Sequence, residues 1–141
     1  MVHKATKIIA NKLREQNLKF DIQESGDVSG VILGTVEDGI QLQYRMLSQD
    51  ENNDVSIYTN EFVQYPPNKK DFGLRQINEF NKNYRFAKFV MDPDDGAVHV
   101  EYFIPMSIGD AEVGDAAVEA MIRLVQIIKD AYPQMMKSIW S

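Results

Sequence analysis

The sequence contains no cysteine, and this absence excludes several classes of site at once. Structural disulfides, zinc–thiolate centres, iron–sulfur clusters and thiol nucleophiles all require cysteine. Long apolar runs are missing too. Residues 1–16 hold the adjacent pair Ile8 and Ile9 but lack the apolar stretch of a secretory signal, and no segment is suited to span a bilayer. We therefore expect a protein of the cytoplasm, a reducing compartment, with no membrane partner.

Motifs of common enzymes are also missing. The chain contains neither a Walker A loop nor a dinucleotide-binding glycine motif, and its nearest approach to a nucleophile elbow, residues 26–30, has the wrong spacing. Of the two histidines, His3 lies near a terminus that we expect to fray, and His99 alternates with valines in a strand. That alternation points His99 away from the core, and no carboxylate partner or pocket for proton transfer can be identified for it. We predict no catalytic residue, no metal site, no cofactor and a non-enzymatic function.

Charge is distributed unevenly along the chain, which has a net charge of −6. Residues 1–20 hold five basic residues against one acidic residue, whereas residues 21–60 hold eight acidic residues against Arg45 alone. A basic first helix beside an acidic sheet is typical of solvated faces that balance one another. A nucleic-acid surface would need a basic patch with stacking aromatic side chains, so we expect no nucleic-acid partner.

The length and composition are those of a single folded unit. Of the 141 residues, 44% are hydrophobic, and no linker, repeat or low-complexity tract interrupts them. We expect one domain spanning residues 1–141. Its first helix is predicted over residues 3–16, where four apolar residues recur at helical spacing: Ala5, Ile8, Ile9 and Leu13.

A meander of strands is predicted to follow this helix. Alternating apolar residues indicate half-buried strands over residues 18–23 and 40–46. Further strands are predicted over residues 31–36 and 54–63, the second of which does not alternate cleanly. Glycine-containing turns are predicted at residues 24–30 and 37–39. The acidic loop at residues 50–54 is predicted to be a solvated turn.

The second helix and a β-hairpin come next. Asn68, directly after Pro66 and Pro67, is placed to cap a helix, and Gly73 should weaken its first turns by about 1 kcal/mol. Four residues are predicted as its apolar contacts: Phe72, Leu74, Ile77 and Phe80. Six residues are predicted to point inward from an antiparallel hairpin: Phe89, Met91, Val98, Val100, Tyr102 and Ile104. Its acidic turn, residues 92–96, carries glycine at the wrong position for a calcium loop and is predicted to be a hairpin turn.

The third helix, predicted over residues 111–132, is the most apolar element. One stripe of seven residues should face the sheet: Val113, Ala117, Ala120, Met121, Leu124, Ile128 and Ala131. A second stripe, formed by Val118, Ile122 and Val125, either packs under the first helix or meets a second subunit or protein ligand. Pro133 is predicted to end the helix before a short tail, in which Trp140 is either a core or lid residue or a docking anchor.

The stretch from Ile77 to Met106 also carries a recognisable pattern. An N-x-x-N-x-x-x-R-F run precedes the hairpin, an acidic turn lies inside it, and a proline ends its second strand; the matching residues are Asn78, Asn81, Arg85, Phe86, Asp94, Asp95, Gly96 and Pro105. This pattern resembles that of the YbjN-type domains, a bacterial family of sensory-transduction regulators. The resemblance implies an α+β fold like that of type III secretion chaperones, in the order helix, strand meander, helix, β-hairpin and helix, and a homodimeric state.

Two functions remain open at this point. The first is a non-enzymatic protein-interaction module, a chaperone-like or regulatory homodimer that binds a polypeptide client in apolar grooves or along strand edges. By the resemblance, the first helix and adjoining strands would form the groove, with Ile8, Leu13, Phe20 and Ile22 as contacts. The second stripe and Trp140 are further candidate contacts. The alternative is a small-molecule-binding regulatory domain, for which Tyr44, Arg45 and Tyr58 are the candidate polar groups.

Overall fold

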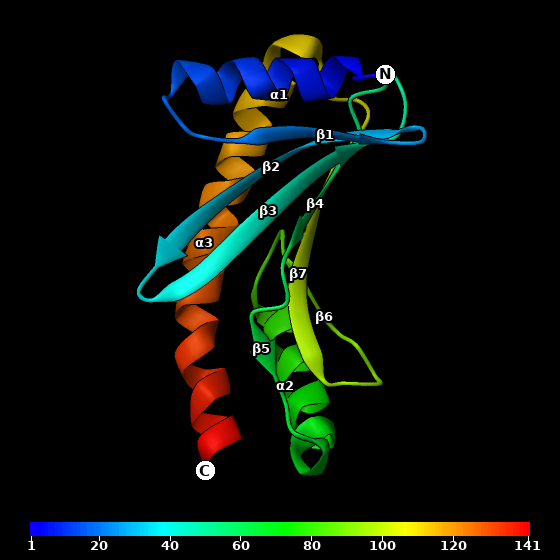
Figure 1. Cartoon of the computed structure of the whole chain (residues 1–141). Helices are drawn as coiled ribbons and strands as arrows, with labels where there is room; N and C mark the ends of the chain where they lie inside the picture. The colour runs from blue at the N-terminus through cyan, green and yellow to red at the C-terminus, as the bar shows by residue number, and fades with distance from the viewer.

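A computed structural model describes residues 1–141 as three α-helices and one antiparallel sheet of seven strands (Figure 1). The strands are β1 (Asp21–Ser25), β2 (Val28–Glu37), β3 (Ile40–Ser48), β4 (Val55–Thr59), β5 (Val63–Gln64), β6 (Lys88–Met91) and β7 (Ala97–Ile104). Strands β1 to β4 are neighbours in chain order. β4 and β5 then pair with one edge of β7, at different points along it, and β6 pairs with its other edge. The predicted α+β class, an antiparallel sheet flanked by helices in the stated order, is confirmed.

The sheet has one buried face. Along β3, buried and exposed residues alternate as predicted, with Leu42, Tyr44 and Met46 pointing inward. The three helices, α1 (Lys4–Glu15), α2 (Lys70–Asn83) and α3 (Asp110–Trp140), pack against this buried face. The opposite face is open, as is common for antiparallel sheets.

Two tight hairpins build the N-terminal meander. The β2–β3 loop is Asp38-Gly39, with both residues at positive φ (53° and 81°), the geometry that two-residue hairpin loops favour. The β1–β2 loop is Gly26-Asp27, with only Gly26 at positive φ (59°). The predicted turn at residues 24–30 was therefore too long. The first strand was also misplaced: β1 begins at Asp21, and all five of its residues are exposed because it forms the sheet edge.

The predicted strand at residues 54–63 is divided in two. β4 ends at Thr59, and β5 resumes at Val63 after a bend. Both pair with β7, at separate points along its length. The side chain of Asn60 fills the bend, because its Oδ1 accepts the Gln43 N–H at 2.8 Å and its Nδ2 donates to the Gln41 carbonyl at 3.2 Å.

The chain start is anchored rather than frayed. His3 is buried, its backbone N–H donates to Ser29 Oγ at 3.0 Å, and its ring lies 2.5 Å from the carbonyl oxygen of Asp27. Glu51 accepts the Lys4 N–H at 3.0 Å and faces the His3 ring at 3.5 Å. The loop at residues 50–54 was predicted to be merely solvated, but it holds the start of α1 in place.

Helix α2 differs from its prediction at its leading end. A 3₁₀ turn, Pro67–Lys69, precedes it, and no side chain caps it, so Asn68 is not an N-cap. Ile77 and Phe80 are buried as predicted, whereas Phe72 and Leu74 are 48% and 46% exposed. Gly73 has a packing role: a Cβ there would lie 2.7 Å from the ring of Tyr65, which is fully buried.

The β6–β7 hairpin is confirmed, with five of its six predicted inward residues buried and Tyr102 partly exposed. Its acidic turn is a hairpin turn: Asp92 Oδ1 accepts the Asp94 N–H at 2.8 Å, and Gly96 takes a φ of +75°. The outer edge of β6 is closed by one side chain. Asn81 Oδ1 accepts the Phe89 N–H at 2.7 Å, and Asn81 Nδ2 donates to the Phe89 carbonyl at 3.1 Å.

Helix α3 is longer than predicted. The predicted core stripe is buried throughout, but Pro133 lies inside the helix, which continues to Trp140. At its C-terminal end, Lys69 Nζ donates to the carbonyl oxygens of Ser138 at 2.8 Å and Ile139 at 3.2 Å. A cation at this position satisfies carbonyls that the helix itself leaves unpaired. No helix in the chain combines the length and apolarity needed to cross a membrane.

Candidate functional site

The first group of predicted contact residues is divided between core and surface. Leu13 is fully buried in the core and cannot contact a partner. Ile8 is half-buried against α3, and the half-buried Phe20 lies beneath the guanidinium of Arg14, which is 5.2 Å from the ring centre. Ile22 is 39% exposed on β1. Of the four, Ile22 is the most available to a partner.

The second group lies on α3. Val118 is buried, Val125 is half-buried and Ile122 is 49% exposed, so the second stripe is only partly covered within one chain. Trp140 is 80% exposed at the end of α3, which contradicts its reading as a core or lid residue. It lines a hollow of about 580 Å³ together with Pro66, Pro67 and Ile139.

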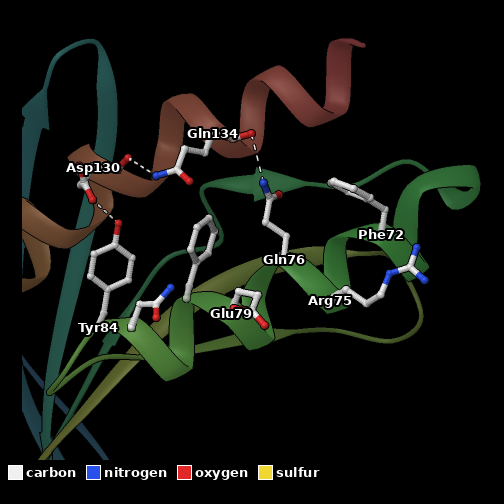
Figure 2. Close-up of a pocket in the computed structure, with 9 residues that line it drawn as sticks. Phe72, Arg75, Gln76, Glu79, Tyr84, Asp130 and Gln134 are labelled. Atoms are coloured by element: carbon white, nitrogen blue, oxygen red, sulfur yellow. Dashed lines mark hydrogen bonds between the residues drawn. The ribbon is translucent and has the colours of Figure 1, made fainter.

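A groove between α2 and the C-terminal half of α3 is a second candidate site (Figure 2). We call it the α2–α3 groove; its volume is about 500 Å³, within the range of ligand pockets. Nine residues line it: Phe72, Arg75, Gln76, Glu79, Phe80, Asn83, Tyr84, Asp130 and Gln134. The rings of Phe80 and Tyr84, whose centres are 5.9 Å apart, provide apolar surface, and charged or amide groups surround them.

Polar side chains join the two helices across this groove. Gln76 Nε2 donates to Ser138 Oγ at 3.0 Å and to the Gln134 carbonyl at 3.3 Å, while Gln76 Oε1 accepts the Tyr65 hydroxyl. Tyr84 donates its hydroxyl to the carboxylate of Asp130. Figure 2 shows Gln76 and Tyr84 reaching from α2 and its end toward α3. Hydrogen bonds therefore bridge the two helices across the groove.

The electrostatics of the groove favour binding over acid–base chemistry. Burial, with the adjacent Asp130 carboxylate as a second cause, raises the pKa of Tyr84 to about 12. Its hydroxyl is therefore protonated at neutral pH and acts as a donor. Burial also raises the pKa of Tyr65 to about 12. General acid–base catalysis favours groups whose pKa lies near the working pH, and these two phenols lie far from it.

A second hollow lies on the open face of the sheet. Its volume is about 400 Å³, and seven residues line it: Gln43, Arg45, Tyr58, Thr59, Asn60, Glu61 and His99. His99 does have a carboxylate partner here, since its Nε2 lies 2.7 Å from Glu101 Oε2; the sequence analysis missed this pair. Arg45 and Tyr58 converge as predicted, whereas Tyr44 is buried on the other face with its hydroxyl 3.1 Å from Thr35.

Nothing in the fold gathers three or more His, Asp or Glu side chains as metal ligands. The residues that form the α2–α3 groove gave only a weak signal in the sequence. Two of them, Phe72 and Phe80, were predicted as helix contacts. Asp130 lies inside the predicted third helix, but Gln134 lies beyond its predicted end, so the position of Gln134 opposite α2 became visible only when that helix proved continuous.

The fold thus defines a class: an α+β protein with one antiparallel sheet, three helices on one face and the other face open. The family model for YbjN, described as "Putative bacterial sensory transduction regulator", matches residues 6–136. The chain belongs to the YbjN family, which confirms the resemblance noted in the sequence. That description is of a regulator and names no reaction.

A solved structure supports the same fold. The chain is similar to the crystal structure of YbjN from E. coli, described there as "a putative transcription regulator", with a TM-score of 0.61 and 12% sequence identity. The similarity covers 91% of each chain. Comparison with curated protein sequences found no match.

Proposed function

We propose that the protein is a cytoplasmic regulatory module, homodimeric and chaperone-like, that binds a polypeptide partner and catalyses no reaction of its own. The observation that carries this proposal is the α2–α3 groove. It combines an aromatic floor, a polar rim and an exposed aromatic residue at its mouth. This is the make-up expected of a site that holds one apolar side chain of a peptide and hydrogen-bonds the chain around it.

The composition of the rim supports a polypeptide ligand. Arg75 and Asn83 make no hydrogen bond or ion pair within the chain, so their donors are available to the carbonyls or carboxylates of a ligand. Glu79 and Asp130 supply acceptors on opposite walls. A main chain presents N–H and C=O groups in alternation, and this mixed rim can satisfy both.

The test is capture of partners from the lysate of the source organism, with the tagged protein and two matched variants. Phe72→Ser removes the aromatic side chain at the mouth of the groove. Leu74→Ser changes a residue of the same helix with nearly equal exposure, 46% against 48%, that does not line the groove. We expect a polypeptide retained by the wild type and by Leu74→Ser and lost from Phe72→Ser. Equal capture by all three proteins would contradict this site.

A second function is favoured by the hollow on the open face of the sheet. There Arg45, without a carboxylate partner, lies beside Tyr58 and the His99–Glu101 pair, an arrangement suited to a small ligand with an anionic group. We propose this small-molecule site as the alternative. It is tested by thermal-shift screening of metabolites against the wild type and Arg45→Ala. A ligand at a hundred times its Kd should stabilise by about 2.7 kcal/mol, and only in the wild type. The absence of any shift across a broad library would count against it.

A further inference from the structure

We propose that two copies of this chain pair through the free edges of their β1 strands, in an antiparallel register centred on Gln23, to form one continuous sheet. This inference rests on the homodimeric part of the proposed function and deepens it by assigning the dimer surface. Three features of the molecule support this pairing: the geometry of the β1–β2 hairpin, the difference between the two outer edges of the sheet, and the sequence of β1.

The hairpin geometry decides which backbone groups of β1 are free. The two-residue loop Gly26-Asp27, with Gly26 at positive φ, is flanked by the pair Ser25–Val28, which such loops place in the hydrogen-bonded position. Hydrogen-bonded and non-hydrogen-bonded pairs alternate along an antiparallel ladder. The N–H and C=O groups of Ile22 and Glu24 therefore point away from β2, toward the open edge.

The two outer edges of the sheet differ in whether a side chain satisfies their free backbone groups. At the β6 edge, the side-chain amide of Asn81 hydrogen-bonds both the N–H and the C=O of Phe89. At the β1 edge, β1 pairs with β2 alone. It carries no lysine, proline or bulge, which are three of the features that protect an exposed edge from pairing, although it is short and holds two carboxylates.

The sequence of β1 is compatible with pairing to itself. Centring the register on Gln23 places Ile22 opposite Glu24 of the second copy, and Asp21 opposite Ser25 of the second copy. No two like charges oppose one another, which removes the usual penalty against self-pairing of an acidic strand. The outward groups of Ile22 and Glu24 then form four hydrogen bonds across the axis, two from each copy.

The register makes a sharp prediction for cross-linking. Gln23 would face Gln23 of the second copy in a non-hydrogen-bonded pair, where Cα atoms lie about 4.5 Å apart, within the range that a disulfide spans. Because the chain has no cysteine, Gln23→Cys introduces a single thiol. We expect this variant to form a disulfide-linked dimer under mild oxidation. Ser25→Cys, on the same strand and likewise exposed, is the control, because the two copies of residue 25 lie too far apart to link in this register.

A second pair of variants tests the edge without a cross-link. Glu24→Pro removes the outward N–H while leaving the bonds to β2 in place, and Glu24→Ala keeps that N–H but removes the same carboxylate. Loss of two hydrogen bonds across the axis should raise the dimer dissociation constant about thirtyfold in Glu24→Pro only, as measured by analytical ultracentrifugation.

The outcomes separate this inference from the proposed function. A wild-type protein that is monomeric at about 100 µM, or a dimer in which Gln23→Cys does not cross-link, would overturn β1 pairing. Partner capture that depends on Phe72 would be unaffected by either result. Conversely, a cross-linked dimer that captures no polypeptide would support the dimer surface and contradict the α2–α3 groove as a polypeptide site.

Discussion

Asn81 gives the most direct test of how the fold is held together. The substitution Asn81→Leu removes both hydrogen bonds to Phe89, a residue only 2% exposed. Leaving a buried N–H and a buried C=O without partners costs about 1–3 kcal/mol each. Because Asn81 is itself on the surface, water can reach these groups once the amide is gone, so the lower limit applies to both. We expect a loss of about 2 kcal/mol in the free energy of unfolding.

The control is Asn78→Leu, in the same helix. Asn78 is exposed and makes no side-chain hydrogen bond, so its substitution should change stability by no more than about 0.5 kcal/mol. Both changes gain the same helix propensity, which therefore cancels. Urea unfolding measures the difference, with equal slopes for the two variants, and hydrogen exchange should quicken at the Phe89 amide. If Asn81→Leu lost no more stability than Asn78→Leu, the closing of the β6 edge by this side chain would be refuted.

Three further outcomes are expected. Gly96→Ala should destabilise the protein by more than about 2 kcal/mol in thermal unfolding, because a Cβ would meet the carbonyl oxygen of Tyr65. Gly26→Ala is the control: it has open space around it and should cost only about 1–2 kcal/mol, for placing an alanine in the left-handed backbone conformation. The pKa of His3 is raised above its ordinary 6.5, chiefly by the hydrogen bond to the Asp27 carbonyl. The stability that His3 contributes is therefore complete below pH 6.5 and is lost as the pH rises through the raised pKa. The difference in unfolding free energy between wild type and His3→Gln should shrink over that range, and a constant difference would contradict this. Lys69→Met should cost about 1 kcal/mol and speed amide exchange in the last turn of α3, and unchanged exchange would show that the cap is unimportant.

Much of the fold could be predicted from the sequence, in those helices and strands that bury one face and expose the other. The stripe from Val113 to Ala131 was predicted in full because a long helix on a sheet repeats its contacts every three or four residues. β3 was predicted equally well, since alternation follows directly from the pleat. β1 was misplaced for the opposite reason. An edge strand with no buried residue leaves no pattern of burial to detect.

Sequence signals for helix ends and buried positions failed where contacts with the rest of the structure decide whether a helix continues or which of its faces is buried. Pro133 removes one hydrogen bond, that to the Lys129 carbonyl, but both residues are exposed, so water can replace it and α3 continues. Phe72 and Leu74 have the spacing of buried residues, yet α2 docks instead through Ile77 and Phe80. No local pattern distinguishes a helix face that meets the sheet from one that borders a groove.

The candidate sites were the least predictable part. Arg45 and Tyr58 were named as polar groups of the predicted strand meander, and they do meet on the open face of the sheet. Their neighbour His99 comes from β7, and its pairing with Glu101 depends on side-chain rotamers that the sequence does not fix. The α2–α3 groove likewise joins residues that are far apart in the chain, such as Tyr84 and Asp130. Sites assembled from separate elements appear only after the elements are placed.

The position of β7 has a consequence for how the chain is made. β7 lies between β4 and β6, so the N-terminal meander keeps an unpaired edge at Val55–Thr59 until residues 97–104 have been synthesised. A nascent chain emerging from the ribosome must therefore hold half a sheet with an open hydrophobic strand while α2 is still being added. We expect folding to be late and cooperative, governed by the arrival of the C-terminal hairpin, and this interval to be the one in which the protein is most prone to aggregate.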